Sequence, residues 1–120
     1  PSGYGRSVRD AGWAFERIVE QKNASEQELA IREVNPSYYC FEASKLFGAL
    51  ERVEQNEASG EYYVTDVPEL LLAGGERVEV IDAVPAADVL SINTPAQLAE
   101  VDRVYRSRSV GGAASGRDGR

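Results

Sequence analysis

The sequence predicts a mixed α/β layer, in which short strands alternate with short amphipathic helices. Three observations support this class. Alternating apolar and polar residues near the N-terminus and around residue 80 are typical of strands, and apolar residues recur at helical spacing in the middle of the chain. Clusters of Gly, Pro, Asn and Ser separate these segments. With 42% hydrophobic and 28% charged residues among 120, we expect one globular domain or part of one.

The N-terminal residues are predicted to form a β-hairpin followed by a helical turn. Residues 3–9 are extended and residues 13–20 alternate well enough for a strand, with a turn triplet between them. Ser25 and Glu28 then form a capping-box pattern, which predicts a short surface helix over residues 26–30.

A strand and the clearest helix are expected next. Residues 34–41 are rich in aromatic side chains and predict a strand, at a sheet edge because Pro36 has no backbone donor. Cys40 is the single cysteine, so no intrachain disulfide can form, and we expect it to be a small buried hydrophobe. Residues 43–53 predict a helix. Its predicted buried face consists of Ala43, Leu46, Phe47, Leu50 and Val53.

The run from Gly60 to Asp66, Gly-Glu-Tyr-Tyr-Val-Thr-Asp, leads from an extended segment into a helix. Its two adjacent tyrosines would point to opposite faces, so one can pack while the other faces a site. Asp66 and Glu69 form a capping-box pattern for a helix over residues 67–73, which stops at Gly74-Gly75. By itself the run is compatible with a packed strand-to-helix corner or with the wall of a binding site.

The C-terminal part is expected to contain short strands, one helix and a tail. The predicted strand, turn and strand occupy residues 78–82, 85–88 and 89–93. Thr94 as N-cap, Pro95 at the first position and Gln97 in a capping box predict a last helix. Its predicted buried face consists of Leu98, Val101 and Tyr105. From Arg106 the composition changes to Gly, Ser, Ala and Arg, which predicts a disordered tail over residues 106–120.

Charge and composition argue against several functions. The net charge of −7 argues against nonspecific nucleic-acid binding, and the lack of histidine removes the Ser-His-Asp triad and most zinc sites. No glycine-rich phosphate-binding motif is present. No apolar run approaches the roughly 20 residues of a membrane span, and no signal peptide is visible, so a cytoplasmic location is expected. The chain begins at Pro1 and has no methionine, so we expect a fragment.

Four polar positions are weak candidates when each is taken alone. Tyr4 stands between two glycines, and Glu20 ends a strand, where a carboxylate is usually just solvated. Asn35 precedes a proline and suits an Asx turn as well as a ligand contact. Asn93 ends an apolar segment before a capped helix, where open α/β sheets place ligands, and its amide oxygen suits a hard cation such as magnesium. A capping or turn role suits Asn93 equally well.

Taken together, five segments resemble one family. They are Gly-Tyr-Gly-Arg at 3–6, Ile-Val-Glu at 18–20, Ala-Ile-Arg-Glu-Val-Asn at 30–35, Gly-Glu-Tyr-Tyr-Val-Thr-Asp at 60–66 and Ser-Ile-Asn-Thr at 91–94. Their order and spacing are similar to the later half of the uridyltransferase domain of bacterial N-acetylglucosamine-1-phosphate uridyltransferases. The resemblance covers about residues 1–105 and implies the C-terminal, sugar-binding part of a Rossmann-like nucleotidyltransferase fold with a mixed sheet.

The resemblance implies a reaction of UTP with N-acetylglucosamine 1-phosphate that gives UDP-N-acetylglucosamine and pyrophosphate, with Mg²⁺ as cofactor. The substrate-binding residues that it implies are Gly5, Glu20, Asn35, Tyr63, Thr65 and Asn93. Asn93 would also be a metal ligand. Tyr63 and Thr65 would face the sugar while Tyr62 packs, and no catalytic residue on this chain is implied.

Departures from the family pattern keep two alternatives open. The family's Asn-Thr-Gly is Asn35-Pro36-Ser37 here, so a different sugar 1-phosphate or nucleotide is an alternative substrate. The nucleotide-binding loop and metal-binding aspartate of the family lie upstream of the matching region. The fragment alone is therefore expected to be inactive, and a non-catalytic sugar-nucleotide-binding module is the other alternative. The family's acetyltransferase repeats are also absent from these residues, so no acetyltransferase activity is expected.

Overall fold

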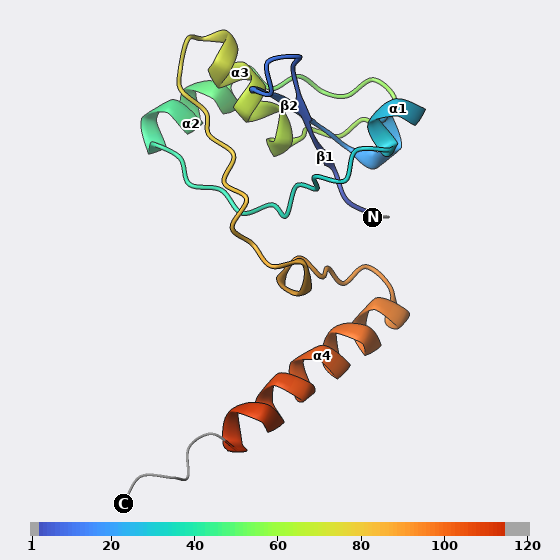
Figure 1. The fold of residues 1–120 in the computed structure, drawn as a ribbon. Helices are drawn as coiled ribbons and strands as arrows, with labels where there is room; N and C mark the ends of the chain where they lie inside the picture. Colours follow the sequence, from blue (N-terminus) through green and yellow to red (C-terminus); the bar gives the residue numbers. More distant parts are fainter. Residues whose placement is uncertain (1–2, 115–120) are drawn as a thin grey trace, which may run out of the picture. The chain divides into compact units, whose positions relative to one another are not determined.

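The computed structural model describes residues 3–114, which form α-helices of 4 to 20 residues and one two-stranded sheet (Figure 1). The elements in chain order are β1 (Arg6–Arg9), β2 (Phe15–Val19), the 3-10 turn η1 (Gln21–Asn23), α1 (Glu26–Leu29), α2 (Ala43–Leu50), the 3-10 turn η2 (Val64–Asp66), α3 (Val67–Ala73), the 3-10 turn η3 (Ala86–Asp88) and α4 (Pro95–Ala114). The chain divides into two compact units, Pro1–Ile81 and Asp82–Arg120. The first unit is the small α/β part and holds all but one of the predicted site residues.

The predicted hairpin is confirmed. β1 and β2 pair antiparallel, with Arg6 opposite Val19, and a bulge interrupts the register at the end of β1. The Asp10 carboxylate closes the turn by accepting hydrogen bonds from the backbone N–H groups of Gly12 (2.8 Å) and Ala14 (2.9 Å). A short side chain that satisfies its own turn is a local feature, which is why the sequence predicts it well.

The segment after Glu33 runs beside β1 but does not continue as a strand. Val34 makes an isolated bridge with Arg6, and the backbone N–H of Asn35 donates to the Gly5 carbonyl at 3.0 Å. The predicted strand over residues 34–41 is therefore wrong, because Pro36 offers no donor and Ser37 adopts a left-handed φ of 61° that turns the chain away. The Cys40 side chain lies on the exposed part of this segment, so the expected burial of Cys40 is also wrong.

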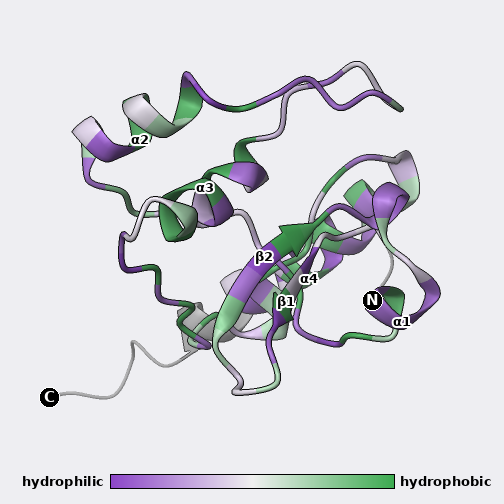
Figure 2. Cartoon of the chain, turned by 90° about the horizontal axis from the view of Figure 1, so that it is seen from above, coloured by the Kyte–Doolittle hydropathy of each residue, from purple (hydrophilic) through white to green (hydrophobic). Residues whose placement is uncertain are grey.

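The core of the first unit lies between α2 and α3. Its buried residues are Ala49, Val67 and Leu71, with partly buried hydrophobic residues packed around them. Figure 2 shows apolar and polar residues in turn along both helices, as expected for helices that bury one side only. The predicted buried face of α2 is partly wrong: Phe47 is 65% exposed, because the seven-residue α3 covers a stripe centred on Ala49. α2 also ends at Leu50 rather than Val53.

The ends of α1 and α3 follow the predicted signals, but the start of α3 does not. Ser25 and Glu28 form the complete capping box of α1. At the end of α3, Gly75 has a φ of 81° and the Glu76 N–H bonds the Leu71 carbonyl at 2.9 Å, so the predicted glycine stop is confirmed. Asp66 makes no capping hydrogen bond, because η2 leads directly into α3 and gives Asp66 a helical backbone.

Between α3 and α4, the structure has fewer regular elements than the sequence predicts. Among the described residues, 78–82 and 89–93 belong to no strand, because no neighbouring strand pairs with them. The expected turn at 85–88 is confirmed by η3. Thr94 caps α4 by accepting from the Gln97 N–H at 3.2 Å, and the Gln97 side chain in return accepts from the Asn93 N–H at 2.8 Å.

α4 is mainly polar along its described side chains. The predicted buried positions Leu98 and Tyr105 are 53% and 70% exposed, so they do not form a buried face. The helix also continues from Arg106 to Ala114, a stretch for which the composition predicts disorder; an ion pair between Arg106 and Asp102 at 2.7 Å spans this boundary. The rest of the predicted tail, residues 115–120, lies outside the described residues. None of the described helices is at once long and apolar enough to cross a membrane.

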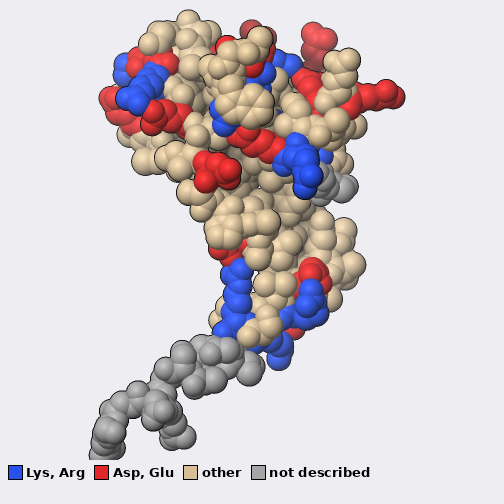
Figure 3. All heavy atoms as spheres, viewed as in Figure 1, with Lys and Arg blue, Asp and Glu red and all other residues tan. Residues whose placement is uncertain are grey.

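Several charged side chains on the first unit form ion pairs. Figure 3 shows acidic and basic residues next to one another on the visible face. Arg9 and Glu33 form a two-pronged pair, with 2.8 Å for each nitrogen–oxygen contact. Lys45 and Glu76 join α2 to the segment after α3. These pairs connect segments that the small core alone holds only weakly.

Candidate functional site

Glu20 stands at the centre of the candidate site. It follows β2 directly, and its Oε1 accepts a hydrogen bond of 2.9 Å from the side-chain hydroxyl of Thr65. Thr65 lies in η2 and is only 6% exposed. The hydrogen bond therefore joins the end of the hairpin to the turn that opens α3, and it brings two predicted site residues together.

Gly5 passes close beside this carboxylate. It stands directly before β1 and is buried. A Cβ atom at this position would lie 3.2 Å from the Val19 carbonyl oxygen, 3.3 Å from the Ile18 Cγ2 and 3.6 Å from Glu20 Oε2. A side chain at this position would crowd these atoms. Because residue 5 is a glycine, its backbone can lie close to both the edge of the sheet and Glu20.

Asn35 is the next residue of the cluster, and its side chain is already engaged. It is 8% exposed, and its backbone N–H donates to Gly5. Its Oδ1 accepts from the Ser37 N–H at 3.1 Å, which is the Asx turn that the sequence suggested as the alternative role of Asn35. Its Nδ2 donates to the Tyr39 hydroxyl at 2.7 Å. Analysis of the sequence did not single out Tyr39, because a tyrosine in an aromatic-rich segment is an ordinary packing residue.

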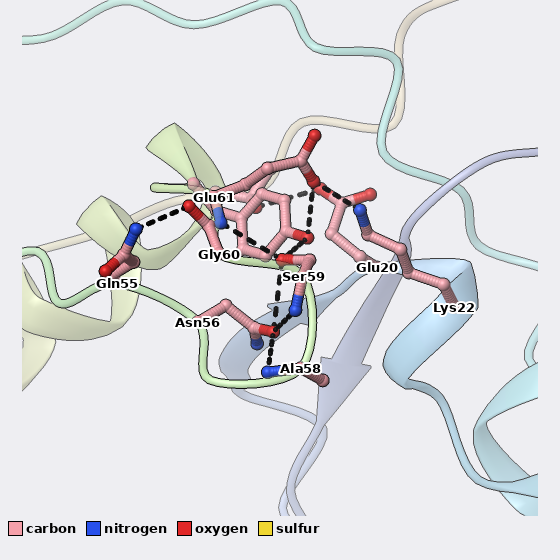
Figure 4. Close-up of polar contacts among 10 residues, drawn as sticks. Glu20, Lys22, Gln55, Asn56, Ala58, Ser59, Gly60 and Glu61 are labelled. Carbon is pink, nitrogen blue, oxygen red and sulfur yellow. Dashed lines mark hydrogen bonds and ion pairs between the residues drawn. The ribbon is translucent and has the colours of Figure 1, made fainter.

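Tyr63 belongs to a polar network beside the Glu20–Thr65 bond. Its hydroxyl lies 2.7 Å from Ser59 Oγ and 2.9 Å from Glu61 Oε2. The ammonium group of Lys22 pairs with Glu61 (Figure 4) and lies 5.1 Å from the centre of the Tyr63 ring. One ring face of Tyr63 is therefore occupied by a cation. The adjacent Tyr62 is 67% exposed, so the prediction that it packs is wrong.

The loop that carries Glu61 and Tyr63 is shaped by its own side chains. The Asn56 side-chain oxygen accepts from the backbone N–H groups of Ala58 (3.1 Å) and Ser59 (3.0 Å), and Gln55 Nε2 donates to the Gly60 carbonyl at 2.7 Å (Figure 4). Gly60 has a φ of 70°, which a residue with a side chain rarely adopts. The glycine of the Gly-Glu-Tyr-Tyr run thus makes the turn that directs Glu61 toward Lys22.

The charges of the site influence one another. The hydrogen bond from Lys22, and then that from the Tyr63 hydroxyl, lower the pKa of the Glu61 carboxyl. Burial, and then the nearby Glu20 carboxylate, raise the pKa of Asp66. The pKa of the Tyr39 phenol is also raised, mainly by burial and further by Glu20, against the opposing hydrogen bonds of Asn35 and Ser37. The pKa values of Asp66 and Tyr39 are thus both raised in part by their proximity to Glu20.

Asn93 belongs to the second unit and has local partners. Its side chain is exposed, and its Nδ2 lies 3.4 Å from Ser91 Oγ. Within the described part of the chain, no three His, Cys, Asp or Glu residues are grouped so that they could hold a metal ion. These residues therefore do not form a metal site by themselves, and the role of Asn93 as a magnesium ligand stays a prediction.

Comparison with known proteins finds relatives that match most of the chain. Over 108 residues the chain is 46% identical to the bifunctional protein GlmU of Geobacillus sp. (strain WCH70), an alignment that covers 90% of this chain and 24% of the relative. The chain matches a segment of GlmU. The GlmU proteins of Solibacter usitatus (strain Ellin6076) and Clostridium botulinum (strain 657 / Type Ba4) are 44% and 40% identical over 108 residues, which cover 90% of this chain and 23% of each relative.

The match to GlmU confirms the resemblance that the five sequence segments indicate. No protein-family model matches the chain. The chain spans about a quarter of the length of the GlmU relatives, 24% for the one from Geobacillus sp.. The similarity therefore concerns one part of those proteins, the part to which the cluster around Glu20 belongs.

Proposed function

We propose that this chain is the sugar-binding part of a sugar-nucleotide transferase, specifically a uridyltransferase that makes UDP-N-acetylglucosamine and pyrophosphate. The similarity to GlmU supports the transferase class. In this proposal the hairpin, α2 and α3 are parts of a Rossmann-like nucleotidyltransferase fold with a larger mixed sheet. The observation that carries the proposal is the grouping of three distant segments around Glu20. Thr65 from η2 donates to its carboxylate, Gly5 from before β1 passes beside it, and Asn35 after α1 is hydrogen-bonded to Gly5.

The chemistry of this cluster suits a sugar. A carboxylate accepts hydrogen bonds from sugar hydroxyls, and one oxygen of Glu20 is already oriented by Thr65. The other oxygen, Oε2, lies beside the closely packed Gly5 backbone. Tyr63 offers an aromatic surface for the ring of a hexosamine, on the face that Lys22 does not cover. Asn35 supports this arrangement through its hydrogen bond to Gly5.

The proposed reaction requires positioning more than acid–base chemistry by the protein. A phosphate oxygen of the sugar 1-phosphate forms a bond to the α-phosphorus of UTP, the bond between the α-phosphorus and its bridging oxygen breaks, and pyrophosphate leaves. No protein nucleophile is needed, so the lack of histidine in the chain is compatible with the reaction. Glu20 and Asn35 would hold the sugar so that its phosphate is aligned with UTP. Mg²⁺ remains a proposed cofactor.

A different sugar 1-phosphate is an alternative substrate, because the chain departs from the family pattern at one position beside Asn35. Ser37 stands where the family pattern has glycine, and it keeps a left-handed backbone with a φ of 61°. The Ser37 side chain also lowers the pKa of the Tyr39 phenol, against the larger effect of burial. A site with this additional hydroxyl near Tyr39 would suit another sugar 1-phosphate. A non-catalytic sugar-nucleotide-binding module is the remaining alternative, since no phosphate-binding loop lies in these 120 residues.

The test is pyrophosphate release from UTP with a panel of sugar 1-phosphates, on the protein that carries this segment at its native length. We expect N-acetylglucosamine 1-phosphate to be preferred. Glu20→Gln should raise the KM for the sugar phosphate about tenfold or more and leave the KM for UTP nearly unchanged. Glu54→Gln, at an exposed acidic residue, is the matched control. Preference for a sugar without an N-acetyl group would support the alternative substrate, and binding without turnover would support the module.

A separate variant tests the second unit. Asn93→Ala should reduce turnover strongly if Asn93 contacts the sugar nucleotide or its metal ion. Because the Asn93 side chain makes only a long contact with Ser91, the variant should leave the melting temperature nearly unchanged. Near wild-type turnover at limiting Mg²⁺ would rule out the metal role.

A further inference from the structure

Tyr39 forms the outer end of the cluster around Glu20. Its hydroxyl oxygen accepts the 2.7 Å hydrogen bond from Asn35 Nδ2, and Asn35 is bonded through its backbone to Gly5 at 3.0 Å. The Gly5 position in turn lies within 3.6 Å of the Glu20 carboxylate, measured from where a Cβ would stand. A continuous series of contacts therefore runs from Tyr39 to Glu20 and on to Thr65.

Asn35 and Tyr39 differ in how exposed they are. Asn35 is 8% exposed and uses both ends of its carboxamide inside the chain, Oδ1 with the Ser37 backbone and Nδ2 with Tyr39. Tyr39 is 36% exposed, so a ligand that approaches this pair finds Tyr39 more accessible than its hydrogen-bond partner Asn35.

The phenol is well suited to a sugar hydroxyl. A tyrosine hydroxyl can accept two hydrogen bonds and donate one, and Asn35 uses only one acceptor position. The raised pKa of Tyr39, caused mainly by burial, keeps the proton available for donation at neutral pH. The ring is held against Phe41, with 5.5 Å between the ring centres and an interplanar angle of 27°. The hydroxyl is therefore presented in a fixed orientation.

We infer that Tyr39 is a further sugar-binding residue of this site, whose hydroxyl hydrogen-bonds an oxygen of the bound hexosamine 1-phosphate beside Asn35 and Glu20. This inference rests on the proposed function, because it assigns one more contact to the same sugar. Recognition at this point thus depends on the Asn35 and Tyr39 side chains together.

The test is Tyr39→Phe in the native-length protein, with the pyrophosphate-release assay. The variant removes the hydroxyl and keeps the ring against Phe41. We expect the KM for N-acetylglucosamine 1-phosphate to rise about tenfold, while the KM for UTP and the melting temperature stay nearly unchanged. Tyr62→Phe, which removes a hydroxyl from a 67% exposed ring, is the matched control and should change neither KM.

Three outcomes separate this inference from the proposed function. If the wild type turns over and Tyr39→Phe changes the KM for the sugar phosphate by less than about twofold, Tyr39 is not a sugar contact although the transferase assignment stands. A fall in melting temperature together with equal rises in both KM values would mean that Tyr39 acts only in folding. If the wild type shows no turnover, the proposed transferase fails, and the Kd for N-acetylglucosamine 1-phosphate is compared by calorimetry. Weaker binding by Tyr39→Phe would support the contact, whereas equal Kd values or no binding would overturn it.

Discussion

Thr65 donates its hydroxyl to the Glu20 carboxylate across 2.9 Å, and this bond connects positions that lie 45 residues apart. Glu20 follows the second strand of the hairpin and Thr65 lies in the turn that leads into α3. Because both side chains are held at the ends of regular elements, the direction of the carboxylate is set by the backbone of the whole unit. The position of the proposed sugar site therefore depends on this contact.

Thr65→Val should lower the free energy of unfolding of the first unit by about 1–2 kcal/mol. Valine keeps the shape of threonine in a position that is 6% exposed, but it leaves Glu20 Oε1 without its donor. Thr65→Ser keeps the hydroxyl, so its free energy of unfolding should fall clearly less than that of Thr65→Val. Urea-induced unfolding monitored by tyrosine and tryptophan fluorescence measures the difference, and equal stability of the valine variant and the wild type would contradict the importance of the bond.

Gly5→Ala should destabilise the hairpin by about 1–3 kcal/mol, because the new methyl group would stand 3.2 Å from the Val19 carbonyl oxygen and 3.3 Å from Ile18 Cγ2. The matched control is Gly48→Ala in α2, where a Cβ meets nothing within 4 Å. There alanine should stabilise the helix by about 0.5–1 kcal/mol. Opposite signs for the same substitution, measured by thermal unfolding, would show that close packing at Gly5 is the cause.

The features that the sequence predicts correctly are those whose partners lie a few residues away. The Asp10 turn, the Ser25–Glu28 capping box and the Gly75 helix end are each closed by hydrogen bonds within about five residues, so their signals are complete in the local sequence. The hairpin is predicted from such a turn together with the alternation of apolar and polar residues on either side of it. Local chemistry is sufficient for all of these features.

The features that sequence analysis misses depend on distant neighbours. Phe47 lies at a regular helical position, yet it is exposed because the small α3 covers a different stripe of α2. Asp66 matches a capping pattern, but the preceding turn joins the helix and removes the cap. Lys22 and Glu61 are 39 residues apart, and no local pattern links them. Burial and long-range pairing are properties of the folded unit. The secondary-structure propensities of the local sequence do not predict them.

Ser37→Gly should raise the free energy of unfolding by about 0.5–1 kcal/mol. Ser37 has a φ of 61°, a conformation that costs a residue with a side chain about 1–2 kcal/mol and costs glycine almost nothing, while the greater freedom of glycine in the unfolded chain offsets part of the gain. The control is Ser44→Gly in the first turn of α2, where glycine should instead destabilise by about 0.5–1 kcal/mol. Chemical denaturation of both variants decides the point: a loss of stability in Ser37→Gly would mean that the effect on the unfolded chain outweighs the backbone strain.

Lys22→Met should raise the pKa of Glu61, which the hydrogen bond from Lys22 and then that from Tyr63 now lower from its ordinary value of 4.5. A lowered carboxyl pKa stabilises the fold above the ordinary value, and this contribution is lost as the pH falls through the folded pKa. For Lys22 the sign is reversed: Glu61 raises the pKa of Lys22, so its contribution is present below the ordinary lysine value and is lost as the pH rises above it. The ion pair therefore stabilises the fold fully at pH values between the ordinary pKa of glutamate and the ordinary pKa of lysine. NMR titration of the Glu61 carboxyl carbon measures the shift.

The Lys22 prediction has a matched control in the other exposed lysine pair of the unit. Lys45→Met removes the partner of Glu76 and should leave the pKa of Glu61 unchanged, because Lys45 bonds the segment after α3 and not the loop around Glu61. Both Lys22 and Glu61 are more than half exposed, so added salt should reduce the shift in the wild type and have less effect in Lys22→Met. If Glu61 titrates at the same pH in the wild type and in Lys22→Met, Lys22 does not hold this loop. The orientation of Tyr63 would then depend on Ser59 and the Asn56 turn alone.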